Sequence, residues 1–173
     1  MGLFIWGSRH SGRTPFRSFD PRAFVVGGFG HDGEAARNYA EVFEYRPKAG
    51  TWMKMAARLP SPRSQLGLAA RGSVLWVFGG LDYDSARGKE AAFRHPTEVL
   101  TWDSSADGAS FGDSGHRLPP ILEKLPVHAA HVRVFPFQKK LLFASVGAEA
   151  EGLLRMAIFT PPLPIATAGL TDG

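Results

Sequence analysis

The stretch AFVVGGFGHDGEAARNYAEVFEY, residues 23–45, decides between two folds for this chain. Three of its glycines follow the G-x-G-x-x-G spacing of a dinucleotide-binding loop, in which backbone N–H groups face a pyrophosphate: Gly28, Gly30 and Gly33. Residues 34–45 would then form the following helix. The motif also needs an acidic residue about 20 positions later to hold the ribose hydroxyls. After Glu44 the chain has no Asp or Glu until Asp82, so we expect the turn of a repeated sheet and no cofactor.

A second copy of the same pattern begins at residue 76 and indicates an internal repeat. Both copies have an apolar run, a Gly-Gly pair, a polar loop, the pair Glu-Val, and an aromatic residue three positions after that Val. These aromatic residues, Tyr45 and Trp102, stand 57 positions apart, and a further 57 positions reach Phe159. Phe19 has the corresponding place in a shortened N-terminal copy. Since a fixed period is the signature of repeat architectures, the chain is predicted to consist of repeated sheets.

The residue types within each copy suit β-strands. Gly-Gly removes two Cβ atoms where the chain turns tightly after an apolar strand. The alternation in EVFEY and EVLTW buries one face of a strand. Tyr45 and Trp52 are expected to supply large apolar faces that pack neighbouring sheets together.

At this point the chain resembles the kelch-repeat family, whose blades have Pro-Arg, an apolar strand pair ending in Gly-Gly, a polar loop, a Tyr and a later Trp. The matching segments are PRSQLGLAARGSVLWVFGG at Pro62–Gly80 with TEVLTWD, and VVGG, EVFEY and TW of the preceding copy. The sequence departs from the pattern at Trp102, where Tyr is usual, and in the third copy, which keeps only Gly147 of the glycine pair.

The resemblance implies an all-β fold, an incomplete kelch-type β-propeller of about two to three four-stranded antiparallel blades. Closed propellers have about four to eight blades. A chain of 173 residues with this period is too short to supply that many. We expect a truncated blade or leader at residues 1–22, kelch-like blades at residues 23–160 and a Pro-rich tail at residues 161–173. Open blade edges would favour self-association.

In a kelch propeller, partners are held by polar and Arg side chains collected from loops of several blades. Carried over to this sequence, the residues after Pro-Arg are implicated first: Arg63, Ser64 and Gln65. The loops after the two Gly-Gly pairs add a second set: Phe29, His31, Asp32, Tyr83, Asp84, Arg87 and Lys89. Arg suits this role because its planar fork binds carboxylates bidentately, although hydrated loops without a partner are the plainer interpretation.

Three kinds of function follow as hypotheses. The first is a non-enzymatic scaffold that binds an acidic segment of another protein, because six basic residues share a stretch without Asp or Glu: Arg46, Lys48, Lys54, Arg58, Arg63 and Arg71. The second is a carbohydrate-binding or mutarotase-like propeller enzyme. The third is a truncated isoform that functions only by pairing with another chain.

Other chemistry has little support in the sequence. The absence of Cys excludes a disulfide framework, a thiol nucleophile and the cross-linked copper site of galactose oxidase. His128 and His131 lie in a sequence context typical of a β-strand and make a poor metal site. Asp82 and Asp84 also make a poor metal site, because they lack the Gly and the Glu of a calcium-binding loop. Nucleic-acid binding is disfavoured because the basic residues lie on no recognisable nucleic-acid fold. No apolar run is long enough to span a membrane, and we expect a cytoplasmic location.

Overall fold

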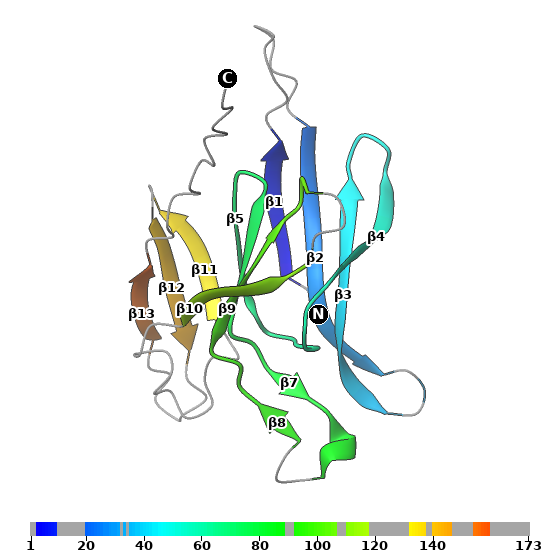
Figure 1. Cartoon of the computed structure of the whole chain (residues 1–173), viewed down its shortest axis with the longest axis vertical. Coiled ribbons are helices and arrows are strands. Elements are labelled where there is room, and N and C mark those ends of the chain that lie inside the picture. The colour runs from blue at the N-terminus through cyan, green and yellow to red at the C-terminus, as the bar shows by residue number, and fades with distance from the viewer. Residues whose placement is uncertain are drawn as a thin grey trace, which may run out of the picture.

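The computed structural model describes residues 3–9, 20–31, 33, 35–88, 92–106, 110–117, 132–137, 140–146 and 154–159, with side chains described only between residues 22 and 117. These residues form antiparallel β-sheets and a single-turn 3₁₀ helix, η1 (Ser85–Arg87) (Figure 1). The all-β, antiparallel architecture predicted from the sequence is therefore confirmed.

The first sheet has the strand order β1 (Leu3–Arg9), β2 (Asp20–His31), β3 (Ala36–Arg46) and β4 (Thr51–Arg58). The opening stretch forms the β2–β3 hairpin, so residues 36–45 are a strand and the helix of a dinucleotide-binding unit is absent from these residues. Strand β1 pairs with β2, which places Ile5 opposite Phe24. The N-terminal segment was expected to belong to a separate shortened copy, but β1 is the first strand of this sheet.

The second sheet has the order β10 (Gly112–Arg117), β9 (Glu98–Asp103), β6 (Val74–Phe78) and β5 (Gly67–Arg71). Between β6 and β9 the chain adds a small hairpin of β7 (Asp82–Tyr83) and β8 (Phe93–Arg94). The third sheet has the order β11 (Val132–Phe137), β12 (Lys140–Val146) and β13 (Leu154–Phe159). The first and third sheets are meanders of sequence neighbours, whereas in the second the β7–β8 hairpin intervenes between the paired strands β6 and β9.

The strand register confirms the repeat at the aromatic positions. Tyr45 lies opposite Ala23, Trp102 opposite Leu75, and Phe159 opposite Leu141. In each of the three sheets, the repeated aromatic residue therefore lies near the end of the third strand. It pairs with a residue near the start of the second strand. The 57-residue spacing marks one structural position in three sheets. Phe19 and Gly147 lie outside the described residues.

The three sheets are arranged like successive blades. Strand β5 lies beside both β1 and β11, so the first strands of the three sheets are neighbours and the later strands extend outward (Figure 1). Strand β6 is buried on both faces: Leu75 and Val77 face the first sheet, and Trp76 and Phe78 stack on the opposite face with ring centroids 6.4 Å apart. The described residues do not close into a ring.

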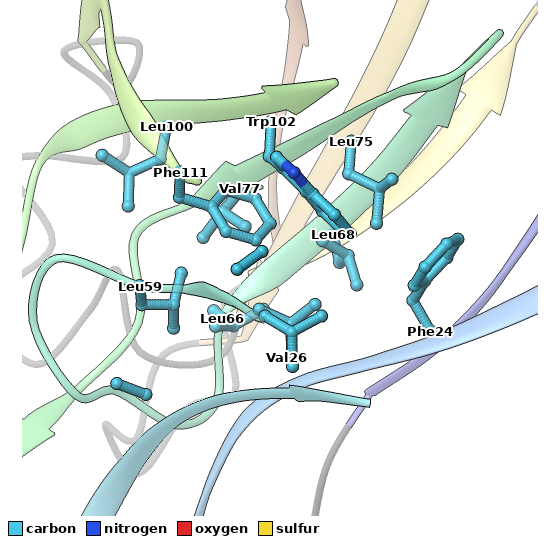
Figure 2. Packing of buried hydrophobic residues seen from close by; sticks show 13 residues of the cluster. Phe24, Val26, Leu59, Leu66, Leu68, Leu75, Val77, Leu100, Trp102 and Phe111 are labelled. Atoms are coloured by element: carbon cyan, nitrogen blue, oxygen red, sulfur yellow. The ribbon is translucent and has the colours of Figure 1, made fainter. Parts of the chain in front are cut away.

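The main core lies between the first and second sheets (Figure 2). The ring of Trp102 packs edge-on against Phe24 with centroids 5.6 Å apart, and against Phe111 at 5.4 Å. Val26 from the first sheet and Leu68 from the second complete the contact. Aromatic pairs of this geometry add about 0.5–1.5 kcal/mol to the burial of their surface.

Tyr45 and Trp52 do not occupy that core, contrary to the sequence expectation. They form a cross-strand pair with ring centroids 5.0 Å apart, and Trp52 is 47% exposed. Strand β3 alternates, with Ala40 and Val42 toward the second sheet, so odd-numbered residues of the strand face away from it. Among the described residues, no sheet covers that other face.

Candidate functional site

The two Gly-Gly pairs shape the segments that form the candidate site: the first lies at a β-bulge within β2, and the second directly follows β6. Gly27, Gly28, Gly79 and Gly80 all have positive φ angles, between 57° and 137°. A Cβ atom at Gly80 would approach the carbonyl oxygen of Ser64 to 2.9 Å. Glycine is therefore required at this turn for both backbone conformation and space, as the repeat pattern predicts.

Arg63 ties the two sheets together at these turns. Its guanidinium is fully buried and donates to the Gly79 carbonyl at 3.2 Å, to the Ser61 hydroxyl at 2.7 Å and to the Glu98 carboxylate at 2.5 Å. Its backbone carbonyl accepts from Gly28 N at 3.0 Å. A charge held in this way is a structural bridge, so the expectation that Arg63 contacts a partner is not supported by its burial.

The two residues after Arg63 differ in exposure. Ser64 is 4% exposed and exchanges two backbone hydrogen bonds with Leu81, of 2.8 and 2.9 Å. Like Arg63, it belongs to the interior rather than to a loop surface. Gln65 is exposed and has φ of 54°, which a residue with a Cβ rarely adopts. Of the Pro-Arg group, Gln65 alone has a side chain available to a partner.

The strand segments that follow the two Gly-Gly pairs bring three aromatic rings together. Phe29 lies edge-on to Tyr83 with centroids 5.9 Å apart, and Tyr83 lies against Phe93 at 4.8 Å. Phe29 is 48% exposed and Phe93 is 56% exposed. We name these three residues the loop aromatic cluster; it lies where the far end of β2 meets the β7–β8 hairpin, at the lower end of Figure 1.

A β-bridge and a side-chain hydrogen bond hold the β7–β8 hairpin against the first sheet. Arg37 of β3 forms an isolated β-bridge with Asp84, and the side-chain Nδ2 of Asn38 donates to the Leu81 carbonyl. Asn38 is buried, so its hydrogen bond is shielded from water. These contacts come from residues about 45 positions apart and fix the distance between Phe29 and Tyr83.

The acidic residues of the hairpin are engaged by Arg87. Its guanidinium lies 3.0 Å from an Asp82 oxygen and 3.5 Å from an Asp84 oxygen. The hydrogen bond to Asp82 is the main reason that the pKa of Arg87 is raised above its ordinary value. Asp84 also accepts from Ala86 N at 2.9 Å and caps η1. Arg87 and Asp84 therefore shape the loop, and these two acidic groups are compensated internally.

Exposed cations border the cluster. Arg94 follows Phe93 directly in β8, and Arg37 is exposed beside Tyr39, with its guanidinium 5.9 Å from the ring centre. His31 is also exposed, and its Nδ1 accepts from Gly33 N at 3.1 Å. The described cations at this border are Arg37 and Arg94, beside Asp82 and Asp84, which share the guanidinium of Arg87.

A second group of charges lies on the outer edge of the first sheet. Lys54 and Arg58 of the edge strand β4 approach Glu41 at 3.7 and 3.3 Å. Burial alone would raise the pKa of Glu41, but hydrogen bonds from backbone N–H groups and these two cations hold the pKa below its ordinary value. Charges on an edge strand discourage pairing with another strand.

Some of the residues singled out from the sequence lie together in the structure. It unites Phe29 and Tyr83, places Asp84 and Arg87 beside them and leaves His31 at the rim. Asp32 and Lys89 lie outside the described residues, as do His128 and His131. Phe93 and Arg94 were not predicted, because no periodic signal marks a two-residue strand inside a polar segment. Arg37 lies in β3 and was not predicted either. Within the described part of the chain, no group of three His, Cys, Asp or Glu residues could hold a metal ion.

Comparison with known proteins gives a likeness of fold. No protein-family model matches the chain, and no curated protein matches it. Among solved structures 106 chains match, including the one titled "Structure of YjhT", with a TM-score of 0.56 and 14% sequence identity. The match covers 84% of this chain but only 50% of the YjhT chain, so the present chain spans about half the length of that structure. No helix among the described residues is long and apolar enough to cross a bilayer.

Proposed function

We propose that this chain is a non-enzymatic protein-interaction module of kelch type, which binds an acidic segment of another protein through the loop aromatic cluster. The observation that carries the proposal is the exposure of Phe29 and Phe93 on either side of Tyr83. The end of β2 and the β7–β8 hairpin hold these two rings in contact with water. Exposed aromatic groups of this kind are enriched at protein interfaces.

The shape of the loops supports recognition without a large rearrangement. The Gly-Gly turns, the Asp84 bridge and the ion pairs of Arg87 fix the backbone on both sides of the cluster. A preordered surface loses less conformational entropy when a partner binds. The kelch motifs of the sequence support the same location, since partners of that family contact loops that follow Gly-Gly.

The charge of the surroundings favours an acidic partner. Arg94 is exposed next to Phe93, and the carboxylates of Asp82 and Asp84 both lie against the guanidinium of Arg87. A segment with Asp or Glu next to a large apolar residue could pair a carboxylate with Arg94 and place the apolar group on the rings. A basic segment would be repelled by the same cation.

A display library of random peptides, selected against the immobilised full chain, tests this function. We expect enrichment of peptides that combine Asp or Glu with a large apolar residue. For an enriched peptide, Phe93→Ser should weaken binding by about 2 kcal/mol, or roughly 30-fold, as at an interfacial hot spot. Trp52→Ser is the matched control, because Trp52 is about equally exposed on a different surface and should leave the affinity unchanged.

Three results would contradict the proposal. Selection without a shared sequence pattern would mean that the surface recognises no peptide class, and equal losses for Phe93→Ser and Trp52→Ser would mean that the cluster is not the binding site. Saturable binding of a monosaccharide that Phe93→Ser abolishes would instead support the carbohydrate-binding hypothesis. Each of these measurements uses the intact chain.

A further inference from the structure

One face of the first sheet carries apolar side chains that no described sheet covers. Its members come from three neighbouring strands and are paired across them, Val25 opposite Phe43 and Tyr45 opposite Trp52. Val25, Phe43 and Tyr45 are half-buried, and Trp52 is 47% exposed. We name these four residues the uncovered face. Its other side is the main core, where Phe24, Val26 and Val42 pack against the second sheet.

The repeat shows what the corresponding face does in the second sheet. The pair Leu75 and Trp102 corresponds to Ala23 and Tyr45, and Val77 with Leu100 corresponds to Val25 with Phe43. The ring of Phe111 contacts that of Trp102, just as the ring of Trp52 contacts that of Tyr45.

All of these second-sheet residues are buried, and Trp102 and Phe111 are 4% and 6% exposed. They are covered by the preceding sheet, whose Phe24 touches Trp102. The uncovered face is therefore the corresponding surface of the first sheet, on which no sheet of the described residues packs.

The third sheet has the complementary register at the other end of the series. Its backbone pairs Leu142 with Ile158 and Ala144 with Met156. Counted from the aromatic pair of each sheet, these positions correspond to Phe24 with Glu44 and Val26 with Val42 in the first sheet. In the first sheet, the residues at these positions form the face that packs against the second sheet. All four positions of the third sheet have apolar residue types.

We propose that a second copy of this chain covers the uncovered face, with its third sheet packed on that face as the first sheet packs on the second. A two-fold axis would make the contact reciprocal, so that each copy covers the first sheet of the other. Two copies of three sheets then form one closed ring.

Association through this face, rather than through strand edges, follows from the charges on β4. That edge strand carries Lys54 and Arg58, and cations along an edge oppose the addition of another strand. The uncovered face instead offers aromatic and β-branched side chains in the arrangement that is already buried once within the chain. The contact therefore continues an existing type of sheet packing.

Light scattering coupled to size-exclusion chromatography tests the proposal on the full chain. We expect a particle of twice the 18.8 kDa chain mass over a wide concentration range. Trp52→Glu should raise the dimer dissociation constant by about a hundredfold or more, because an unpaired carboxylate would be buried. Trp52 is exposed within one copy, so this variant should keep the circular dichroism spectrum of the parent chain. Ile158→Asp, on the other side of the proposed contact, should have the same effect.

Phe93→Glu provides the matched control, because it places the same charge on an exposed aromatic residue outside the uncovered face. It should leave the dimer intact. A monomer at every concentration, or a dimer that Trp52→Glu leaves unchanged, would overturn the proposal. Open-ended oligomers would also overturn it, since reciprocal contacts close at two copies. Loss of the dimer in Phe93→Glu alone would move the interface to the loop aromatic cluster.

Discussion

The same substitution, tryptophan to alanine, can be made once in the buried core and once on the uncovered face, and its effect on stability can be compared between the two. Trp102 is 4% exposed between the first and second sheets, whereas Trp52 is 47% exposed on β4. Burying a whole tryptophan removes roughly 150–250 Å² from water, worth about 4–6 kcal/mol at about 25 cal/mol per Å². Partial burial in the unfolded chain lowers such values by about 10–40%.

These quantities give different expectations for the two variants. Trp102→Ala should lower the free energy of unfolding by about 4 kcal/mol, since it also leaves a cavity between Phe24 and Phe111. Trp52→Ala should lower it by about 2 kcal/mol, because about half of the side chain is already in water and no enclosed cavity remains.

Urea unfolding followed by far-ultraviolet circular dichroism measures both values without depending on tryptophan fluorescence. The protein concentration should be one at which light scattering shows monomers, so that any contact between copies does not contribute. Equal losses for the two variants would refute the assignment of a buried and an exposed face. A loss below about 1 kcal/mol for Trp102→Ala would place that residue on the surface and undo the strand register.

Three further variants test the packing of the loops and the first sheet. Arg63→Met should cost about 3–5 kcal/mol in urea unfolding by leaving the Glu98 carboxylate without its cation, and adding Glu98→Met should restore part of that loss. Gly80→Ala should destabilise the chain more than Gly33→Ala in thermal unfolding. Both glycines have positive φ, but only at Gly80 would a Cβ meet a neighbouring carbonyl. Because the folded-state pKa of Glu41 is lowered, its stabilising contribution is present above its unfolded pKa of about 4.3 and is lost as pH falls through the folded value. Glu41→Gln should therefore reduce the loss of stability between neutral and acidic pH, measured by urea unfolding at both; an unchanged loss would contradict the role of its ion pairs.

Much of the fold follows from short-range patterns in the sequence. The alternation in EVFEY and EVLTW predicts β3 and β9, and the 57-residue spacing predicts the equivalence of Tyr45, Trp102 and Phe159. Gly-Gly predicts the positive-φ turns. These features are accessible because the side-chain period of a strand and the conformational freedom of glycine are local properties of the chain.

The candidate site was only partly accessible in this way. Phe29 and Tyr83 follow the two Gly-Gly pairs and could be named from the repeat. Phe93 joins them only because β8 folds back on β7, and nothing in its local sequence marks it. Arg63 was expected at a surface, yet the crossing of two sheets encloses its guanidinium.

The sequence by itself determined the strands, their turns and their repetition, because each depends on residues a few positions apart. The tertiary structure decided which surfaces are covered. Tyr45 and Trp102 hold the same position in their strands, but Trp102 is buried by the sheet before it, and no described sheet precedes Tyr45. The burial of a side chain depends on neighbouring residues from distant parts of the chain, and the local sequence does not indicate whether such neighbours are present.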